Sequence, residues 1–305
     1  MSVEVRQFRR DDREQLASLV NAHIGAVVPG MSVSVNRLLG QLEREPGEFI
    51  VDPWVDERVT LVAVQRQRVA AAAHLLRYGS GPSVSESYRS AGEVRWFVSW
   101  PNARHWPDAA EAGDELLRAS VAQLDRWRVA RQFADGSLPA PGVYGVPAQW
   151  PHVEAALGRV GFEHQGRVEI VFLRELGDRR EGPAPSRAGL SIRRSLGGNG
   201  TRLAALAGDG EEVGFIEVEL LGDAERLPRS GGWADVGNLF VHEQCRRRGI
   251  ASQLIEEAGR WLQLGHVDRL LAYATPDEHA VIALYVANGF VELTRTKRGW
   301  LRVAA

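Results

Sequence analysis

The chain has 305 residues, enough for two domains that each bury a core of their own. Hydrophobic residues make up 44% and charged residues 25%, values that are typical of globular proteins and exclude disordered or collagen-like chains. Lys and Arg total 37 against 39 Asp and Glu, so the net charge of −2 offers no global attraction for nucleic acid or anionic membranes. Any anion site must therefore be local.

Cysteine usage and the N-terminal sequence indicate the compartment. The single cysteine, Cys245, cannot form an intramolecular disulfide, and without a cysteine pair we expect neither a zinc site nor a redox motif. Met1–Asp12 is already charged, and no run of about 18 apolar residues occurs. We therefore expect no signal peptide, no membrane-spanning helix and a cytoplasmic location.

The first part of the sequence predicts strands and helices in mixed order. In chain order we expect a strand at Glu4–Phe8, helices near Asp12–His23 and Val35–Arg44, strands at Val59–Gln65, Val69–Tyr78 and Glu93–Trp100, a helix near Ala109–Arg128, a strand near Gly142–Gly145, a helix near Pro151–Val160, and terminal strands.

A linker rich in charge, Gly and Pro follows at Gly177–Arg187 (GDRREGPAPSR). It predicts a first domain over residues 1–177, a linker over 178–188 and a second domain over 189–305. In the second domain we expect strands at Leu190–Arg194, Arg202–Leu206, Gly214–Leu220 and Asp235–His242, a helix at Gly249–Leu264, a strand at Arg269–Ala274, a helix at Asp277–Asn288, and a closing strand pair. Both parts predict mixed α/β layers.

The two parts share an order of features that indicates an internal duplication. Residues 92–100 (GEVRWFVSW) and 234–242 (ADVGNLFVH) each form a strand-like run with an acid near its start, before a loop and a long helical pattern. Residues 153–174 and 281–302 each contain a helical stretch, a Gly-Phe pair and strand-like segments.

The most informative segment is Asn238–Gly265. Its helix has one apolar face, and the basic stretch Arg246–Gly249 lies between a strand and the first helical turn. Unpaired backbone N–H groups and the positive end of the helix dipole form an anion site there. Glycine permits close approach, and the small Ala251 and Ser252 keep the first turn uncovered. The alternative is a solvated basic turn that only caps a helix.

At this point the sequence resembles the GNAT superfamily of acetyl-CoA-dependent acyltransferases. Arg246-x-x-Gly249-x-Ala251 fits its Q/R-x-x-G-x-G/A signature, with an L-F-V strand before it and an amphipathic helix after it. The run A-L-Y-x-x-x-G-F at Ala283–Phe290 fits the second motif of the family. The resemblance covers nearly all of residues 189–303.

The resemblance implies acetyl-CoA as the cosubstrate, with no metal. The backbone of Leu239, Phe240 and Val241 would pair with the pantetheine arm as an added strand would. The diphosphate would be cradled by the amides of a following set of residues: Arg246, Arg247, Arg248, Gly249, Ile250, Ala251 and Ser252.

The resemblance also implies an acid. Tyr285 lies where the family has a tyrosine that donates a proton to the leaving thiolate, and a phenol with a pKa of about 10 stays protonated at neutral pH. The alternative is a tyrosine that only packs in the core. One departure is Glu278, which stands seven residues before Tyr285 where the family often has Asn.

An amine acceptor must lose a proton, so a base or a water chain is needed. Asp235 aligns with the glutamate base of histone-type and mycothiol-synthase-like members, and its shorter side chain favours action through water. The alternative is a structural aspartate paired with an arginine, and His242, Glu217 and Glu219 are weaker substitutes as base. Gly237 and Asn238 interrupt the strand and favour a β-bulge. We interpret Cys245 as incidental.

The first part lacks these features. It has no R-x-x-G-x-G/A match after Trp100, and Asp108, Glu111 and Asp114 crowd the expected helix start, where carboxylates repel a diphosphate. Leu157 replaces the tyrosine. We therefore expect an α/β (mixed α+β) fold of two tandem GNAT-like domains, each a mixed central sheet flanked by helices, with a degenerate first domain and a catalytic second one, as in mycothiol synthase.

The leading hypothesis is an N-acetyltransferase that transfers acetyl from acetyl-CoA to a primary amine of a small molecule by direct attack on the thioester. The alternative is a non-catalytic acyl-CoA sensor or interaction module, and nucleic-acid binding is a distant third. We expect a monomer or homodimer with no nucleic-acid or membrane partner. Because Ser195–Gly200 is too short for the one or two helices that the family normally inserts there, we expect the acceptor cleft at the junction of the two domains. The first domain would supply a wall, and its Trp96, Trp100 and Trp106 either provide apolar surface or only fill its own core.

Overall fold

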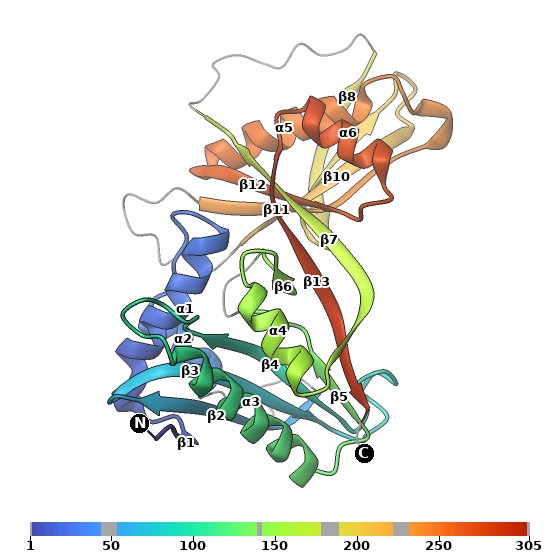
Figure 1. Cartoon of the computed structure of the whole chain (residues 1–305). Coiled ribbons are helices and arrows are strands. Elements are labelled where there is room, and N and C mark those ends of the chain that lie inside the picture. Colours follow the sequence, from blue (N-terminus) through green and yellow to red (C-terminus); the bar gives the residue numbers. More distant parts are fainter. Residues whose placement is uncertain (1, 44–53, 139–141, 178–188, 222–231, 304–305) are drawn as a thin grey trace. The chain divides into compact units, whose positions relative to one another are not determined.

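The computed structural model describes residues 2–43, 54–138, 142–177, 189–221 and 232–303 (Figure 1). The predicted linker 178–188 lies outside these ranges. The chain divides into two compact units: unit 1 consists of Met1–Val168 and Arg295–Ala305, and unit 2 consists of Glu169–Thr294. None of the helices within the described ranges is long and apolar enough to span a membrane.

Unit 1 is a mixed sheet with helices. Its strands lie in the order β1 (Glu4–Gln7), β2 (Val55–Gln65), β3 (Arg68–Tyr78), β4 (Ala91–Ser99), β5 (Arg131–Ala134) and β13 (Val291–Val303), and β6 (Val146–Pro147) also pairs with β13. Among the described strands of this unit, β4 and β5 pair in parallel and the other pairs named here are antiparallel. The helices are α1 (Arg13–Val27), α2 (Val35–Leu42), α3 (Ala109–Arg126) and α4 (Pro151–Arg159).

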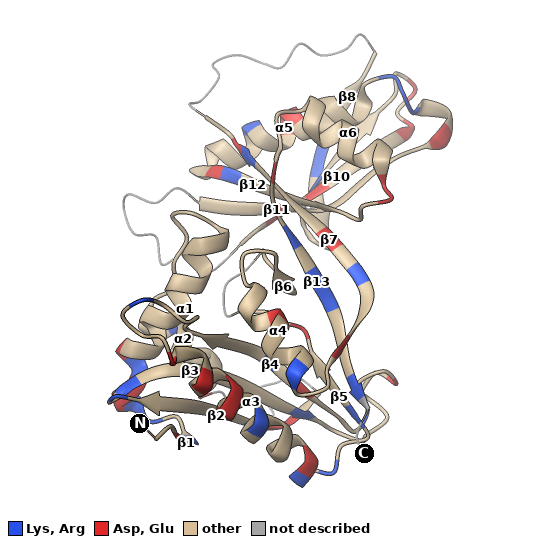
Figure 2. Ribbon diagram, viewed as in Figure 1, with Lys and Arg blue, Asp and Glu red and all other residues tan. Residues whose placement is uncertain are grey.

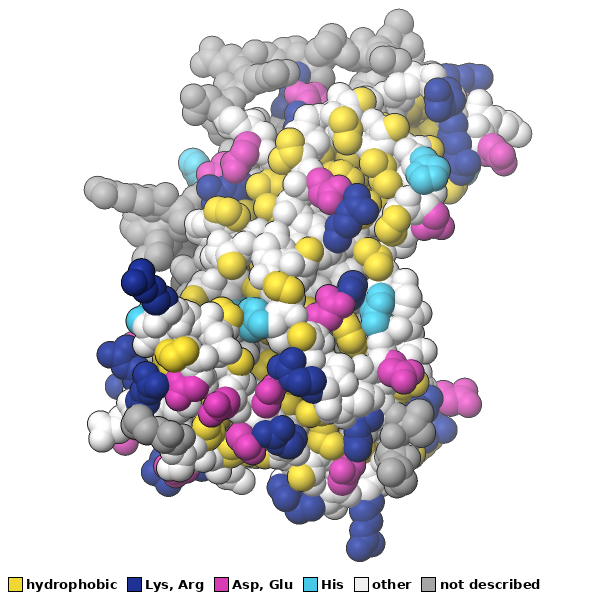
Figure 3. Space-filling view, viewed as in Figure 1, with side chains coloured by type: hydrophobic (Ala, Val, Ile, Leu, Met, Phe, Trp, Pro, Cys, Tyr) yellow, Lys and Arg dark blue, Asp and Glu magenta, His cyan; other side chains and the backbone are white. Residues whose placement is uncertain are grey.

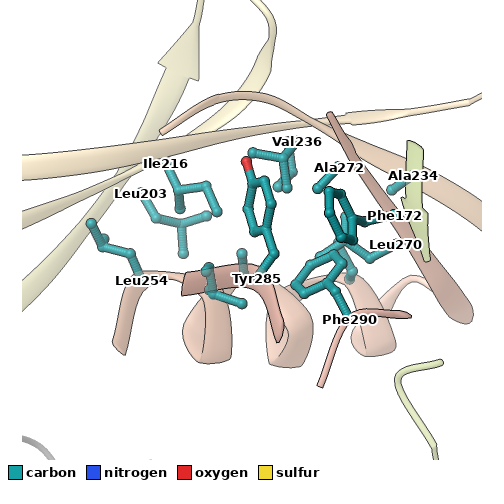
Figure 4. Packing of buried hydrophobic residues seen from close by; sticks show 14 of the residues in the cluster. Phe172, Leu203, Ile216, Ala234, Val236, Leu254, Leu270, Ala272, Tyr285 and Phe290 are labelled. Carbon is teal, nitrogen blue, oxygen red and sulfur yellow. The ribbon is translucent and has the colours of Figure 1, made fainter. Parts of the chain in front are cut away.

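Unit 2 has the strand order β7 (Glu163–Glu175), β12 (Val267–Ala274), β11 (Gly232–Val241), β10 (Glu212–Leu220), β9 (Gly200–Leu206) and β8 (Ser191–Gly197). Of the strand pairs in the described part of unit 2, β11–β12 is parallel and the others are antiparallel. Its helices are α5 (Ile250–Leu264) and α6 (His279–Ala287). The apolar face of α5 includes Leu254 and Leu262, which belong to one cluster with Ile216, Ala234 and Leu270 of the sheet. Figure 4 shows Leu254 among the sheet residues of this cluster. Burial of this face holds α5 against the strands.

The two halves of the chain exchange their last strands. Ile170–Glu175 of β7 pairs with Arg269–Ala274 of β12 in unit 2, whereas Trp300–Val303 of β13 pairs with Arg131–Ala134 of β5 in unit 1. The compact units therefore differ at their ends from the predicted domains 1–177 and 189–305. Cross-strand hydrogen bonds decide which sheet a strand completes, and position along the chain does not.

Most expected elements are present within a few residues of their predicted bounds, and the mixed α/β class is confirmed. Strand β5 was not predicted, because its four residues give no alternating pattern. The strand expected at Gly142–Gly145 is wrong: both glycines have φ of 90°, and strand β6 begins only at Val146. The closing strand pair is also wrong, because β13 is one long strand.

A repeated bulge supports the internal duplication. The β10–β11 register shifts between Glu217 and Val218, which leaves Gly237 as the extra residue of β11. The β3–β4 register shifts in the same way and leaves Arg95 as the extra residue of β4. A carboxylate lies two residues before each bulge: Asp235 in unit 2 and Glu93 in unit 1.

The helix that follows repeats as well. The Phe290 N–H donates to the Tyr285 carbonyl at 3.1 Å, and the Phe162 N–H donates to the Leu157 carbonyl at the same distance. Leu157 therefore occupies in unit 1 the place that Tyr285 has in unit 2, as the sequence predicted.

Candidate functional site

The parallel pair β11–β12 opens partway along its length. Pairing runs from Gly232 beside Val267 to Asp235 beside Leu271, and the register of these two strands ends there. Beyond that point β11 continues to Val241 and pairs with β10 on its other side. The edge of β11 that faces β12 thus lies outside the ladder, and its backbone groups can pair with an extended ligand.

The loop at the start of α5 has a backbone that suits an anion. Arg247 and Gly249 are both left-handed, with φ of 62° and 76°, and left-handed residues in a turn are typical of backbone N–H concavities that bind anions. Gly249 is the N-cap and has no side chain to cap the first turn. Arg246 Nε donates to the Val241 carbonyl at 3.1 Å, which holds the loop against the end of β11. Figure 2 draws the three arginines as a blue segment beside α5.

A cavity of about 820 Å³ joins the open edge of β11 to this loop. That volume lies in the range of small-molecule sites. On the face seen in Figure 3, hydrophobic side chains gather around α6 and Lys and Arg side chains border them. The cavity is lined by ten of the residues that the sequence singled out: Leu239, Phe240, Val241, Arg246, Arg247, Gly249, Ile250, Ala251, Ser252 and Tyr285. Arg248 and Asp235 are not in its lining.

Tyr285 stands on α6 between the cavity and the core. Its ring lies 5.1 Å from that of Phe290 and 5.7 Å from that of Phe172, and Figure 4 shows its hydroxyl pointing toward Val236 of β11. The side chain is 4% exposed. Burial, and secondarily the charge of Glu278, raises the pKa of the phenol to about 12. Tyr285 therefore packs in the core and also presents a protonated hydroxyl to the cavity.

Asp235 lies at the point where β11 and β12 separate. It is 8% exposed, and burial raises the pKa of its carboxyl to about 6. The Tyr273 hydroxyl donates to Oδ2 at 3.2 Å and opposes this rise, whereas the charge of Glu219 adds to it. The other oxygen, Oδ1, is buried and has no hydrogen-bond partner among the described residues. The alternative, a structural aspartate, requires an arginine partner, and these contacts of Asp235 include no arginine.

The substitutes for Asp235 have other contacts. Glu217 is buried, and its carboxylate accepts from Arg202 Nη1 at 3.1 Å and from the amides of Gly198 and Asn199 at 3.4 and 3.3 Å. Glu219 is exposed and lies directly across from Asp235 on β10. His242 is exposed, and its ring contacts that of Phe240. Only Asp235 therefore combines burial with an unused acceptor atom.

Two further cavity residues carry polar groups that sequence reasoning did not assign. Tyr273 lines the cavity and connects it to Asp235 by the hydrogen bond above. Tyr273 lies two residues beyond Leu271, the β12 partner of Asp235, and the sequence alone carries no signal for this contact. Glu278 also lines the cavity, and its carboxylate accepts from the backbone N–H of Thr275 at 2.7 Å. Glu278 thus orders the turn before α6. Cys245 is half-buried in the lining.

In unit 1, the helix that corresponds to α5 is α3, and side chains of unit 1 contact its start. Asn102 Oδ1 accepts from the Ala110 N–H in the first turn of α3 at 2.8 Å. Asp108, the N-cap, pairs with Arg66 at 2.7 Å, as expected of carboxylates at a helix start. The Trp106 indole donates to Gln65 Oε1 at 2.7 Å. The first turn of α3 thus has partners within unit 1.

The carboxylate of unit 1 that corresponds to Asp235 also has a hydrogen-bond partner. Glu93, at the place of Asp235, is 2% exposed and accepts from the Tyr78 hydroxyl. Burial raises its pKa, and Arg95 lowers it. Trp96 is buried and stacks on His74 with ring centroids 5.7 Å apart. Trp96 and Trp106 therefore make internal contacts of unit 1. Among the described residues, no group of three His, Cys, Asp or Glu side chains suits a metal ion.

Comparison with known proteins identifies the domain that carries this site. The family model for the acetyltransferase (GNAT) domain matches residues 199–292. No curated protein matches the sequence. Among solved structures, a tandem GNAT protein from the clavulanic acid biosynthesis pathway is similar with a TM-score of 0.65 at 15% identity, over 100% of this chain and 99% of that chain.

Two further structures share the fold. A GCN5-related N-acetyltransferase from Sphaerobacter thermophilus has a TM-score of 0.58 at 16% identity, over 98% of this chain and 94% of that chain. A GCN5-related glucosamine N-acetyltransferase region of a fungal multi-domain GH3 β-N-acetylglucosaminidase has a TM-score of 0.62 at 13% identity, over 98% of this chain and 38% of that chain. Residues 199–292 are thus a GNAT acetyltransferase domain, and the whole chain has the fold of a tandem GNAT protein.

Proposed function

We propose that the protein is an acetyl-CoA-dependent N-acetyltransferase that acts on a primary amine of a small molecule, with the chemistry confined to unit 2. One observation carries the proposal: the opening between β11 and β12 has an uncapped helix start at one end and a buried, half-satisfied carboxylate at the other. The first feature suits a diphosphate and the second suits a proton acceptor.

The residues present fit acetyl-CoA. The edge of β11 at Leu239–Val241 offers backbone groups to the pantetheine amides, and the nest at Arg247 and Gly249 offers N–H groups to the diphosphate. The small Ala251 leaves the first turn of α5 open. When bound, acetyl-CoA supplies a thioester that the amine attacks directly, so that a C–N bond forms as the C–S bond breaks.

Asp235 takes the proton of the attacking amine in this proposal. A carboxyl with a pKa of about 6 is mostly ionised at pH 7, and it is a stronger base than an ordinary aspartate. Tyr273 holds one of its oxygens and leaves Oδ1 for the amine or for a bridging water. The short side chain favours the water.

Tyr285 gives its proton to the departing sulfur. Its pKa of about 12 keeps the phenol protonated over the working pH range. The same burial raises the pKa of the CoA thiol that forms beside Tyr285. The pKa difference between the phenol, which donates the proton, and the thiolate, which accepts it, therefore becomes smaller. Solvent then returns a proton to Tyr285 and removes one from Asp235, so no net charge accumulates.

Unit 1 has a structural role in this proposal. The first turn of its α3 is already bonded to Asn102, its counterpart of Asp235 is bonded to Tyr78, and Leu157 replaces the acid. These contacts support a unit that folds without running the reaction.

Isothermal titration of acetyl-CoA tests the binding step. The double variant Arg247→Glu/Gly249→Glu places two carboxylates in the nest and should weaken binding at least tenfold. Arg104→Glu is the matched control, because Arg104 is an exposed arginine of unit 1. Undiminished binding by the double variant would remove the assignment of the loop.

Turnover separates an enzyme from a sensor. With acetyl-CoA and a panel of amines, released thiol should appear for the native protein, and Tyr285→Phe should lose turnover while acetyl-CoA still binds. A non-catalytic acyl-CoA sensor would bind acetyl-CoA and release no thiol with any amine.

A further inference from the structure

The sheet of unit 2 has a second face whose side chains follow from the strand register. Phe215, Glu217 and Glu219 alternate along β10 and share one face. Their cross-strand partners on β11 share it too: Phe240 lies opposite Phe215, Asn238 opposite Glu217, and Asp235 opposite Glu219. The intervening Ile216, Val218, Ala234 and Val236 belong to the core beneath α5, so this face is the one directed away from α5.

One end of this face is acidic. Asp235 and Glu219 are cross-strand neighbours, and the charge of Glu219 raises the pKa of the Asp235 carboxyl. Glu219 is exposed and Asp235 keeps one unpartnered oxygen. Two neighbouring carboxylates, one of which has an oxygen without a hydrogen-bond partner, attract a cation that carries hydrogen-bond donors.

The other end is aromatic. The ring centroids of Phe215 and Phe240 lie 5.8 Å apart, and that of His242 lies 5.1 Å from Phe240. The Arg202 guanidinium lies 3.4 Å from the Phe215 ring centroid and covers that ring. Phe240 is 39% exposed, and it also lines the cavity assigned to acetyl-CoA. An exposed ring beside a small-molecule cavity favours contact with an apolar group of a ligand.

A rigid turn lies between the two ends. The hairpin Gly197–Gly200 connects β8 directly to β9. Glu217 holds this turn through the amides of Gly198 and Asn199, and Asn199 lies so close to the Gly237 bulge that a Cβ on Gly237 would come within 2.7 Å of it. The turn therefore forms a fixed wall of this face.

We propose, on the basis of the proposed function, that the acceptor is a primary amine with a short chain that ends in a flat apolar group. Its ammonium binds at Asp235 and Glu219, and its apolar group rests on Phe240. The ends are four β10 residues apart, about 13 Å between Cα atoms at the usual rise of a strand, and the contact distances from the ligand to the carboxylates and to the ring take up part of this span. The ammonium gives one proton to Asp235, which releases it to water, and the neutral amine then attacks through nitrogen. Asp235 takes the second proton of that nitrogen as the C–S bond breaks, and Tyr285 protonates the leaving sulfur.

Steady-state kinetics of the full chain with saturating acetyl-CoA test this specificity. The probes are 2-phenylethylamine, n-butylamine, spermidine and glucosamine, followed by released thiol. We expect kcat/KM for 2-phenylethylamine to exceed that for n-butylamine at least tenfold, because only the former covers the Phe240 ring. In Phe240→Ala this ratio should fall toward one. The ratio is insensitive to any change in acetyl-CoA affinity, because both amines share the same bound cosubstrate.

Two variants complete the design. Glu219→Gln should raise KM for both amines alike, because it removes charge from the acidic end and leaves the rings in place. Leu264→Ala, at an exposed apolar residue near the end of α5, should leave the ratio unchanged. Both positions are exposed, so neither variant threatens folding.

The outcomes separate the two proposals. If n-butylamine, spermidine or glucosamine is acetylated as efficiently as 2-phenylethylamine, or if Phe240→Ala keeps the ratio, the specificity is wrong while the acetyltransferase stands. If acetyl-CoA does not bind, or binds without turnover of any amine, the proposed function fails and the specificity fails with it.

Discussion

Asp235→Asn should make the protein more stable at pH 8 while it abolishes turnover. In the folded chain, burial raises the pKa of the Asp235 carboxyl from 3.8 to about 6, so ionisation above pH 6 opposes folding. Asparagine keeps the shape and the acceptor for the Tyr273 hydroxyl but carries no charge. A rise in pKa of this size corresponds to about 3 kcal/mol, and partial contact with water reduces the expected gain to about 1–2 kcal/mol.

The pKa shift of Asp235 determines how the stability difference between Asp235→Asn and the native chain changes with pH. A raised pKa means that the folded chain holds the Asp235 proton more tightly, so the contribution of Asp235 to stability is fully present below about pH 4 and is lost as the pH rises to about 6. The difference between Asp235→Asn and the native chain should therefore be close to zero at pH 4, and it should grow to its full value above pH 7. Urea unfolding followed by circular dichroism at pH 4, 6 and 8 measures it.

Glu217→Gln is the matched control on the same face of the same sheet. Glu217 is also buried, but its carboxylate is bonded to Arg202 and to the turn amides of the β8–β9 hairpin. Loss of its charge should destabilise the chain by about 1–3 kcal/mol. The reasoning is refuted if Asp235→Asn is destabilising at pH 8, or if its effect does not change with pH.

Three further predictions concern the reaction and its loop. The kcat/KM for an amine acceptor should fall as the pH drops through about 6, because protonation of Asp235 removes the base. Tyr273→Phe should move the midpoint of this fall to higher pH, because the Tyr273 hydrogen bond lowers the pKa of Asp235. A pH–rate profile measures both effects. Tyr285→Phe should reduce kcat at least 100-fold with an unchanged Kd for acetyl-CoA, and single-turnover kinetics with titration distinguish the two effects. Gly249→Val should weaken acetyl-CoA binding at least tenfold, because a β-branched residue at φ of 76° distorts the nest, whereas Gly158→Ala, in open space on α4, should bind normally.

Local patterns predicted the parts of the site that depend on neighbouring residues. The apolar periodicity of α5 and the Gly at its start were sufficient to place the loop, because a helix start exposes N–H groups whatever surrounds it. Gly237 likewise predicted the bulge, because glycine in a strand interior marks a break in the ladder.

Features that depend on the partner strand were not predictable from one sequence. The Tyr273 bond to Asp235 and the aromatic pair Phe215–Phe240 both join residues far apart in the chain, and they follow only from the registers of β11 with its neighbours. The burial of Asp235 also depends on the neighbouring strands and was therefore not predictable. An aspartate at a strand start has no sequence signal that separates a buried base from a solvated residue.

The exchange of β7 and β13 has a consequence for the history of such a chain. The strand that completes the sheet of unit 2 beside β12 is encoded in the first half of the chain, and the C-terminal strand of the second half completes the sheet of unit 1 beside β5. After the duplication, neither half could be deleted without opening the sheet of its neighbour. Under the proposed function, selection on the fold of the second half is therefore sufficient to retain a first half that does not run the reaction.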